Sequence, residues 1–231
     1  MTDWPADLAD ALGRHSFLLR GGHEYDGRLI AELDEEGLRD VANEIRKRGL
    51  RTAAVTSVFS PVTAEMELRA AEVLREEVPG LKISLSHEIG RVGFLERENA
   101  TIMNACLADL SFKVVDSFRN ALLEKGINAP FYISQNDGTL MTPNHVERYP
   151  VLTFASGPTN SMRGAARLAG LGDAMVVDIG GTTSDVGMLM QGFPRESAVA
   201  GVVGGGPTHL RKPAALAVGL GRGSHPRDPG P

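Results

Sequence analysis

The residues best suited to chemistry lie in one short stretch, 178–185, directly after the apolar run 174–177. The stretch holds two acids, two glycines and three hydroxyl residues: Asp178, Asp185, Gly180, Gly181, Thr182, Thr183 and Ser184. Paired glycines let the backbone take up φ > 0 and turn several N–H groups toward one anion. The hydroxyls add donors, and the carboxylates can hold Mg²⁺ or orient a water. The pattern predicts a phosphate-binding hairpin that turns at the two glycines, with Asp178 at the end of a central strand.

An ordinary β-turn uses the same residue types, so the surrounding sequence has to distinguish the two interpretations. Ser156, Gly157 and Pro158 introduce a helix expected over 162–169, and N–H groups at its N-terminus can bind a phosphate or a carboxylate. Simple helix capping explains these three residues equally well. Further upstream, the polar residues at 135–137 can face a substrate, although a tight turn is the favoured interpretation.

His87 and Glu88 lie where a strand is expected to give way to a loop, and their side chains suit a metal ion. No further ligand follows at a supporting spacing, so a hydrogen-bonded surface histidine is the favoured interpretation. Cys106 is the single cysteine, which excludes an internal disulfide and a cysteine-based zinc site. It falls in an apolar helical pattern and is predicted to be a small buried side chain.

The bulk composition limits the classes of function. The chain has 231 residues, of which 42% are hydrophobic and 23% charged, so a core can form and neither disorder nor a membrane span is favoured. A net charge of −5 lacks the basic field that nucleic acids and anionic membranes attract. No secretory signal is read at the start. The expected location is cytoplasmic, and the expected partners are small molecules or proteins, with no nucleic acid and no membrane.

Hydrophobic periodicity predicts an α/β fold. The expected elements are a strand-turn-strand piece over 15–33, a helix from Asp34 to Gly49, a strand over 53–59, a helix from Pro61 to Pro79, a strand over 81–85, a long helix over 96–124, and strands over 131–134, 174–177 and 197–203. Two successive strand-helix units argue for a parallel or mixed sheet. The long helix is expected to have one apolar side that includes Leu110, Val114 and Phe118. Residues 204–231 hold seven glycines and five prolines, and this content predicts a disordered tail.

Three groups of motifs, in one order, resemble the A subunit of the hydantoinase/5-oxoprolinase family. They are Leu81-Lys-Ile-Ser-Leu-Ser-His-Glu88 with Leu95-Glu-Arg97 and Thr101-x-x-Asn-Ala105, then Gln135-Asn-Asp-Gly-Thr-Leu-Met141, then Ser156-Gly-Pro158 with Gly164-Ala-Ala-Arg-Leu-Ala-Gly170 and Asp178–Asp185. The resemblance covers about residues 15–203 and extends, more distantly, to acetone and acetophenone carboxylase subunits.

The resemblance implies an actin-like ATPase with ribonuclease-H-like lobes that uses ATP and Mg²⁺ to open a cyclic amide such as a hydantoin or 5-oxoproline. It implies Asp178 and Asp185 as catalytic residues, with Asp178 also on the metal. Ser156, Gly157 and residues 180–184 are implied to contact the nucleotide. A hydantoinase B-type subunit is the implied partner.

The chain is expected to be incomplete relative to the family, because relatives carry another Asp-x-Gly-Gly-Thr hairpin and continue far beyond Gly204. In that interpretation, 1–14 is an N-terminal segment, 15–92 an N-terminal-type α/β region, 93–203 the region with the phosphate hairpin, and 204–231 the tail.

Three functions stay open. The first is the ATP-dependent hydrolase, with the isolated chain inactive. The second is a sugar- or acetate-kinase-type phosphotransferase, disfavoured because its first hairpin normally lies near the N-terminus. The third is a non-enzymatic remnant or partner-docking subunit. A carboxylase-like subunit is a variant of the first.

Overall fold

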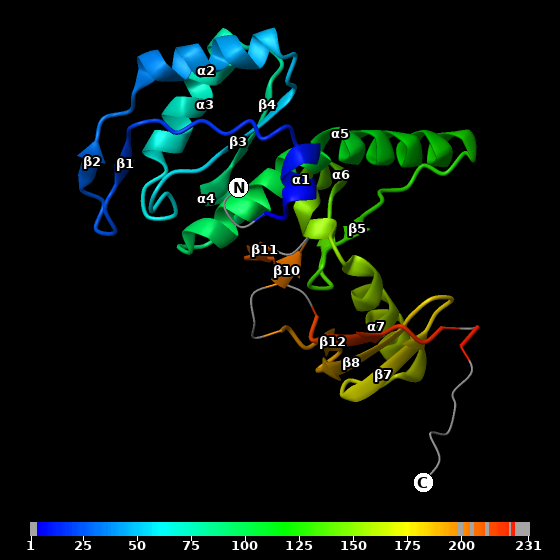
Figure 1. Ribbon diagram of the computed structural model, residues 1–231. Helices are drawn as coiled ribbons and strands as arrows, with labels where there is room; N and C mark the ends of the chain where they lie inside the picture. Colours follow the sequence, from blue (N-terminus) through cyan, green and yellow to red (C-terminus); the bar gives the residue numbers. More distant parts are fainter. Residues whose placement is uncertain (1–3, 198–200, 204–205, 211–212, 222, 225–231) are drawn as a thin grey trace. The chain divides into compact units, whose positions relative to one another are not determined.

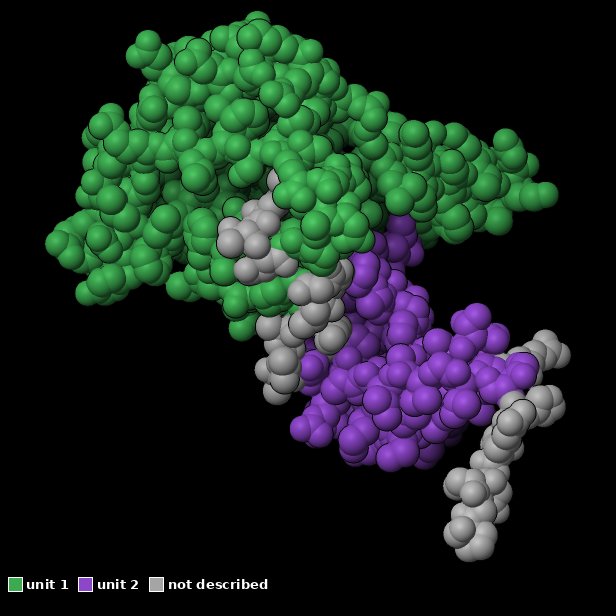
Figure 2. All heavy atoms as spheres, in the orientation of Figure 1, with its two compact units in different colours: residues 1–131, 142–152, 200–210 green, residues 132–141, 153–199, 211–231 purple. Residues whose placement is uncertain are grey.

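The computed structural model describes residues 4–197, 201–203, 206–210, 213–221 and 223–224 (Figure 1). The chain divides into two compact units (Figure 2). Unit 1 comprises residues 1–131, 142–152 and 200–210, and unit 2 comprises residues 132–141, 153–199 and 211–231. The four-part division expected from the sequence stays a prediction.

Unit 1 holds the expected strand-helix repeats. Its elements are α1 (Ala6–Ala11), β1 (Gly22–His23), β2 (Leu29–Ala31), α2 (Glu35–Lys47), β3 (Thr52–Val55), α3 (Glu65–Glu77), β4 (Lys82–Leu85), α4 (Ser86–Ile89), α5 (Phe94–Glu124), α6 (Pro143–Arg148), most of η1 (Pro150–Thr153), β10 (Gly201–Val203) and β11 (Gly206–Thr208). The predicted strand-turn-strand piece is confirmed as the antiparallel pair β1–β2, and β3 and β4 pair in parallel, as the two strand-helix units predicted.

Helix α2 begins where its capping residue indicates. The Asp34 carboxylate accepts a hydrogen bond from the Gly37 N–H at 3.0 Å, as an N-cap should. Leu38, Ala42 and Ile45 recur at helical spacing and lie buried against α3 and the start of β4. Helix α3 begins at Glu65, so the expectation that Pro61 opens it was wrong; residues 59–62 form turns instead.

Helix α5 buries a different side from the one its large apolar residues suggested. Leu110, Val114 and Phe118 are 58%, 53% and 49% exposed. The buried residues of α5 are, apart from Val115, small or polar: Arg97, Asn99, Ala100, Thr101, Asn104, Ala105, Ala108 and Ser111. Small side chains allow α5 to pack closely on β3 and β4. This close packing determines which side of α5 is buried, although the large apolar residues lie on another side. Cys106 is exposed, so its predicted burial was wrong.

A buried polar network at the carboxyl ends of β3 and β4 joins α3, α4 and α5. Glu67 is fully buried, and its carboxylate accepts from the N–H of Ser57 at 2.9 Å, from the N–H of His87 at 3.0 Å and from the Ser86 hydroxyl. His87 Nδ1 lies 2.7 Å from the same carboxylate. The guanidinium of Arg97, also fully buried, donates to Ser86 Oγ and to the Ser57 carbonyl. Burial lowers the pKa of Arg97, and the negative charge of Glu67 opposes part of that shift. The family-like motifs around His87 and Arg97 therefore hold unit 1 together.

Replacing Glu67 with Gln should destabilise unit 1 by about 3 kcal/mol, because an amide nitrogen would face donors that now find a carboxylate oxygen. Urea unfolding followed by circular dichroism measures the change. Glu76→Ala is the matched control, since Glu76 is an exposed acid on the same helix. Equal stability of the two variants would contradict the structural role of Glu67.

Part of the glycine-rich tail belongs to the core of unit 1. Strand β11 pairs with β10, and Thr208 and Leu210 are buried. Between them, His209 Nδ1 accepts from the N–H of Arg91 at 3.1 Å. The expectation of disorder was therefore wrong for residues 206–210. The predicted strand over 197–203 and the predicted tail fall partly outside the described residues. The residues not described there are 198–200, 204–205, 211–212, 222 and 225–231.

Acid should weaken unit 1 through His209. Burial, the largest cause, lowers the pKa of this histidine, and the Glu96 carboxylate opposes part of the shift. The neutral ring is therefore favoured in the folded state, so its stabilisation is complete above the ordinary value near 6.5 and is lost as the pH falls below it. The unfolding temperature should fall between about pH 7 and pH 5, and less so in His209→Gln. The exposed His145→Gln variant is the control; an unchanged pH profile in His209→Gln would refute the assignment.

Unit 2 is a small sheet with a helix on one face. Its elements are β5 (Ile133–Ser134), β6 (Leu140–Met141), α7 (Ser156–Ala169), β7 (Ala174–Ile179), β8 (Ser184–Met190), β9 (Phe193–Pro194) and β12 (Ala215–Val218). The strand order is β12-β8-β7, with β9 also on β8 (Figure 1). Among the described strands β8 is therefore central and β7 lies at the edge, so the predicted central position of Asp178 was wrong. Strand β12 also shows that residues 215–218 are not disordered.

The two faces of this sheet differ. Alanines of α7 pack on the face that carries Ala174, Val176 and Leu189, while Met175 and Ile179 on the other face are 70% and 71% exposed. Within the part of the chain that the structure describes, no helix is long and apolar enough to span a bilayer.

Candidate functional site

The predicted hairpin is present in unit 2. Strands β7 and β8 are antiparallel, with Ile179 opposite Ser184, and the N–H of Gly180 donates to the Thr183 carbonyl at 2.9 Å. The chain therefore turns through Gly181 and Thr182, one residue later than predicted. Neither glycine has a positive φ, so backbone freedom is not why glycine stands here. A Cβ added to Gly181 would meet nothing within 4 Å, whereas one added to Gly180 would lie 3.2 Å from the Thr183 carbonyl oxygen. Gly181 therefore leaves one side of the turn open to an approaching group.

The tip of this hairpin presents a group of unused donors. The N–H groups of Gly181, Thr182 and Thr183 have no acceptor among the described residues, and all three residues are exposed. The Thr182 and Thr183 hydroxyls are likewise without a partner in the described part of the chain. Adjacent free amides at a turn form a concave, positively polarised surface that binds anions. Ser184 differs, because its hydroxyl donates to the Leu220 carbonyl at 2.6 Å and its single proton is already used.

Two carboxylates face each other beside these donors. Asp178 and Asp185 are direct cross-strand partners, so their side chains leave the same face of the sheet. Both are partly buried, and both lie on the face toward which Val176 and Gly187 also point. Like charges directly opposite destabilise a sheet unless a cation lies between them. Mg²⁺ is commonly held by one or two carboxylates together with phosphate oxygens and waters, and this donor set fits it. The described residues contain no group of three or more His, Cys, Asp and Glu side chains able to hold a metal.

Ser156 and Gly157 also belong to unit 2. They open α7 after Ala155, which adopts φ 57°. One turn later, the Thr159 hydroxyl donates to the Asn136 carbonyl at 2.9 Å. The start of α7 is therefore tied to the turn over 135–139. No hydrogen bond or ion pair of the described residues joins Ser156 or Gly157 to the hairpin, and their contact with a nucleotide stays a prediction.

The turn over 135–139 is the tight turn that the sequence favoured. The N–H of Gln135 donates to the Thr139 carbonyl at 2.8 Å, and Asp137 accepts from both the N–H and the hydroxyl of Thr139. Asn136 is buried, and its amide nitrogen has no partner. Arg163, whose guanidinium lies 4.1 Å from the centre of the Phe193 ring, likewise has one unpaired buried nitrogen.

His87 and Glu88 do not form a metal site in the described structure. His87 is hydrogen-bonded, as predicted, but its side chain is only 17% exposed rather than on the surface. Glu88 pairs with Arg148 and accepts from the Tyr149 hydroxyl. Sequence reasoning missed Glu67, although an acid next to the apolar positions Met66 and Ala70 of an amphipathic helix was a usable signal.

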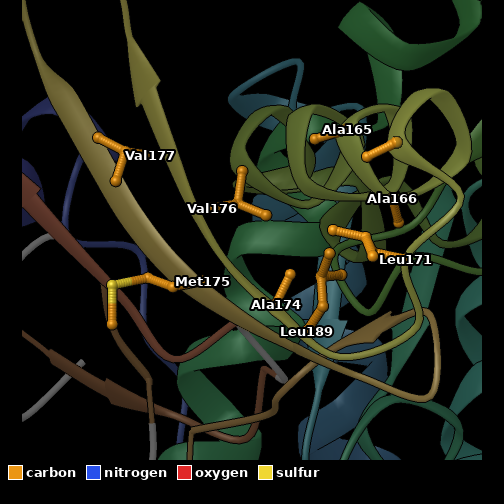
Figure 3. Close-up of a pocket in the computed structure, with 9 residues that line it drawn as sticks. Ala165, Ala166, Leu171, Ala174, Met175, Val176, Val177 and Leu189 are labelled. Carbon is orange, nitrogen blue, oxygen red and sulfur yellow. The ribbon is translucent and has the colours of Figure 1, made fainter.

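A cavity of about 220 Å³ lies between α7 and β7 (Figure 3). Its lining is entirely apolar: Ala165, Ala166, Ala169, Leu171, Ala174, Met175, Val176, Val177 and Leu189. Its side chains carry no charge and no polar group, so this cavity adds no candidate for chemistry.

Comparison with known proteins shows the family of this chain. Residues 97–229, more than half of the chain and including the hairpin, match the model of the hydantoinase/oxoprolinase family. Residues 6–78 match the model of the hydantoinase/oxoprolinase N-terminal region. The chain belongs to the hydantoinase/oxoprolinase family.

Two known proteins are similar in sequence to this family member. It is 25% identical over 210 residues to the acetophenone carboxylase gamma subunit of Aromatoleum aromaticum, covering 87% of this chain and 28% of that protein. It is 27% identical over 175 residues to an uncharacterized protein of Methanocaldococcus jannaschii, covering 74% of this chain and 26% of that protein.

Two solved structures share its mixed α/β fold. The nucleotide-free acetone carboxylase structure matches with a TM-score of 0.70 and 22% identity over 97% of this chain and 34% of that chain. The ATP-dependent caprolactamase of Pseudomonas jessenii matches with a TM-score of 0.74 and 22% identity over 91% of this chain and 31% of that chain. This hydantoinase/oxoprolinase chain thus spans about a quarter to a third of the length of these relatives.

The facing carboxylates give a direct test of metal binding in unit 2. Asp185→Asn removes one of two opposed charges. In EDTA it should therefore increase the free energy of unfolding by about 0.2–1 kcal/mol and slightly raise the unfolding temperature. The same change should abolish the rise in unfolding temperature that Mg²⁺ gives the unsubstituted chain. Differential scanning fluorimetry with and without Mg²⁺ measures both effects. The exposed Asp40→Asn variant should retain the Mg²⁺ response; an Mg²⁺ response kept in Asp185→Asn would refute the site.

Proposed function

We propose that this chain is the A-subunit-like part of an ATP-dependent hydrolase of cyclic amides, of the hydantoin or 5-oxoproline type. The observation that carries the proposal is the hairpin tip, where three unpaired N–H groups adjoin two facing carboxylates. Free amides suit a phosphate, and paired carboxylates suit the Mg²⁺ that accompanies a nucleotide. Unit 2 would then be the ribonuclease-H-like lobe of an actin-like ATPase, here with β7 at an open edge.

In this proposal each residue has a stated task. Residues 181–183 bind the phosphate chain through backbone N–H groups and two threonine hydroxyls. Asp178 and Asp185 hold Mg²⁺, and the one that keeps a free oxygen orients the attacking water. ATP supplies the phosphoryl group that activates the ring amide. Ser156 and Gly157 are proposed as further nucleotide contacts at the start of α7.

Two relatives favour different versions of this function. The solved caprolactamase is named as ATP-dependent, and its name describes action on a cyclic amide, which supports the hydrolase. The similarity to an acetophenone carboxylase gamma subunit extends over 87% of this chain and supports a carboxylase-like subunit as the second candidate. Both versions use the hairpin in the same way. A hydantoinase B-type subunit is the proposed partner of the first version, and the cytoplasm its proposed location.

We expect the isolated chain to bind ATP–Mg²⁺ weakly and to turn it over negligibly. Phosphoryl transfer needs the charge of the triphosphate to be neutralised from several directions, and residues 1–231 include one phosphate hairpin of the two expected in the family. Loss of one positioning element lowers a catalytic rate by a factor of about 10² or more. Isothermal titration with ATP–Mg²⁺ measures binding, and ADP release with hydantoin, 5-oxoproline or caprolactam measures turnover. Asp178→Ala should weaken the binding, whereas Asp40→Ala should not.

Two results would overturn parts of this proposal. If no binding of ATP–Mg²⁺ is found at millimolar concentration, the hairpin is not a nucleotide site. If a ring substrate stimulates ADP release and Asp178→Ala abolishes it, the chain is a working enzyme by itself and the expectation of inactivity is wrong.

A further inference from the structure

A second glycine-containing turn packs directly on the tip of the hairpin. A Cβ added to Gly221 would lie 2.6 Å from the Gly181 carbonyl carbon and 2.7 Å from Thr182 Cα, with the Gly181 oxygen closer still. Real Cβ atoms do not approach backbone atoms so closely, so only glycine fits at 221. Gly221 has no positive φ among the described backbone angles, so its glycine is explained by this close approach and not by backbone conformation.

Hydrogen bonds fix this second turn in place. The Ser184 hydroxyl, at the start of β8, donates to the Leu220 carbonyl at 2.6 Å. Within the turn, the N–H of Gly221 donates to Ser224 Oγ at 3.1 Å, and the N–H of Ser224 donates to the Gly221 carbonyl at 2.8 Å. Strand β12, which precedes the turn, pairs with β8 through Val218 opposite Ser184. The turn is therefore tied to the same strand that carries the hairpin.

Unused donors remain on this second turn as well. The N–H of Gly223 has no acceptor among the described residues, and the Ser224 hydroxyl accepts a bond but still has its own proton to donate. Both residues are exposed. They therefore add one amide and one hydroxyl donor to the three amides and two hydroxyls of the hairpin tip. Donors from two sides of one group satisfy a polyphosphate better than one turn does, because its charge is spread over several oxygens.

We propose that Leu220, Gly221, Gly223 and Ser224 form the second wall of the phosphate site, so that the polyphosphate of a nucleotide is held by donors of this turn together with those of the hairpin tip. Gly221 is the positioning residue, because its lack of a side chain sets how closely the two turns approach. Gly223 and Ser224 supply donors. Ser184 serves the site by holding Leu220. The inference rests on the proposed nucleotide function and extends it to a segment that composition alone marked as a disordered tail.

The test measures binding of inorganic tripolyphosphate with Mg²⁺ to the full chain by isothermal titration. Gly221→Ala forces the two turns apart and should weaken binding about 10-fold or more, the loss expected when one or two charge-assisted hydrogen bonds fail. Gly219→Ala is the matched control two residues away, since a Cβ there meets nothing within 4 Å, and it should bind as the unsubstituted chain does. Circular dichroism and the unfolding temperature show whether each variant is folded.

Each result has one meaning. If the unsubstituted chain does not bind tripolyphosphate, the proposed nucleotide function fails and this inference fails with it. If that chain binds and folded Gly221→Ala binds equally well, the function stands and the second wall is refuted. If Gly221→Ala does not fold, the exposed Ser224→Ala decides: weaker binding supports the second wall, and unchanged binding overturns it.

Discussion

The register of β7 against β8 is the constraint on which the candidate site depends. It places Asp178 opposite Asp185, and it leaves a turn of two residues whose N–H groups are unpaired. A shift of either strand by one residue would send the carboxylate of that strand to the opposite face and remove the pairing of Asp178 with Asp185. What holds the register is packing on the α7 side, where Met162 Cε would lie 2.8 Å from a Cβ at Gly187. A side chain at Gly187 would meet the end of the Met162 side chain, which would have to move, so this glycine lets α7 pack beside the strands that carry the two carboxylates.

Local features of the fold could be predicted from the sequence, because they depend on residues close together in the chain. The Asp34 cap, the parallel β3–β4 pair, the turn at 135–139 and the hairpin after Val177 all follow from capping, periodicity and turn chemistry. Strand order could not be predicted in the same way. The apolar run 174–177 is typical of a buried central strand, yet β7 lies at the edge of the described sheet, with Met175 and Ile179 exposed. An apolar strand sequence indicates that both faces of the strand can be buried, but it does not indicate which strands lie beside it.

The polar core of unit 1 shows why apolar character was a poor guide to burial. On α5, the structure buries the polar Arg97, Asn104 and Thr101 and exposes the apolar Leu110 and Phe118. Buried polar groups are tolerated when every donor and acceptor is paired, and here they are: Asn104 contacts Ser84, the Arg148 carbonyl and the Val151 N–H. Such pairing joins residues as far as 108 positions apart, as in the bond from the Asn99 amide to the Pro207 carbonyl, and no periodicity of one segment can reveal it. The motifs that resemble the family around His87 and Arg97 are thereby explained by architecture.

The glycines of residues 204–231 and of the hairpin show that glycine content alone does not predict what a glycine does in the fold. A glycine has three uses in a folded chain: positive φ, close approach of another group, and flexibility. The sequence of 204–231 was interpreted through flexibility alone, but Gly221 is a close-approach glycine, and Gly206 and Thr208 belong to a strand. At the hairpin the interpretation was positive φ, whereas neither Gly180 nor Gly181 has a positive φ, and Gly181 leaves one side of the turn uncovered. Which use applies depends on the residues that pack against the glycine in the folded chain. The hairpin tip is contacted by a turn that begins at Leu220, 36 positions downstream of Ser184.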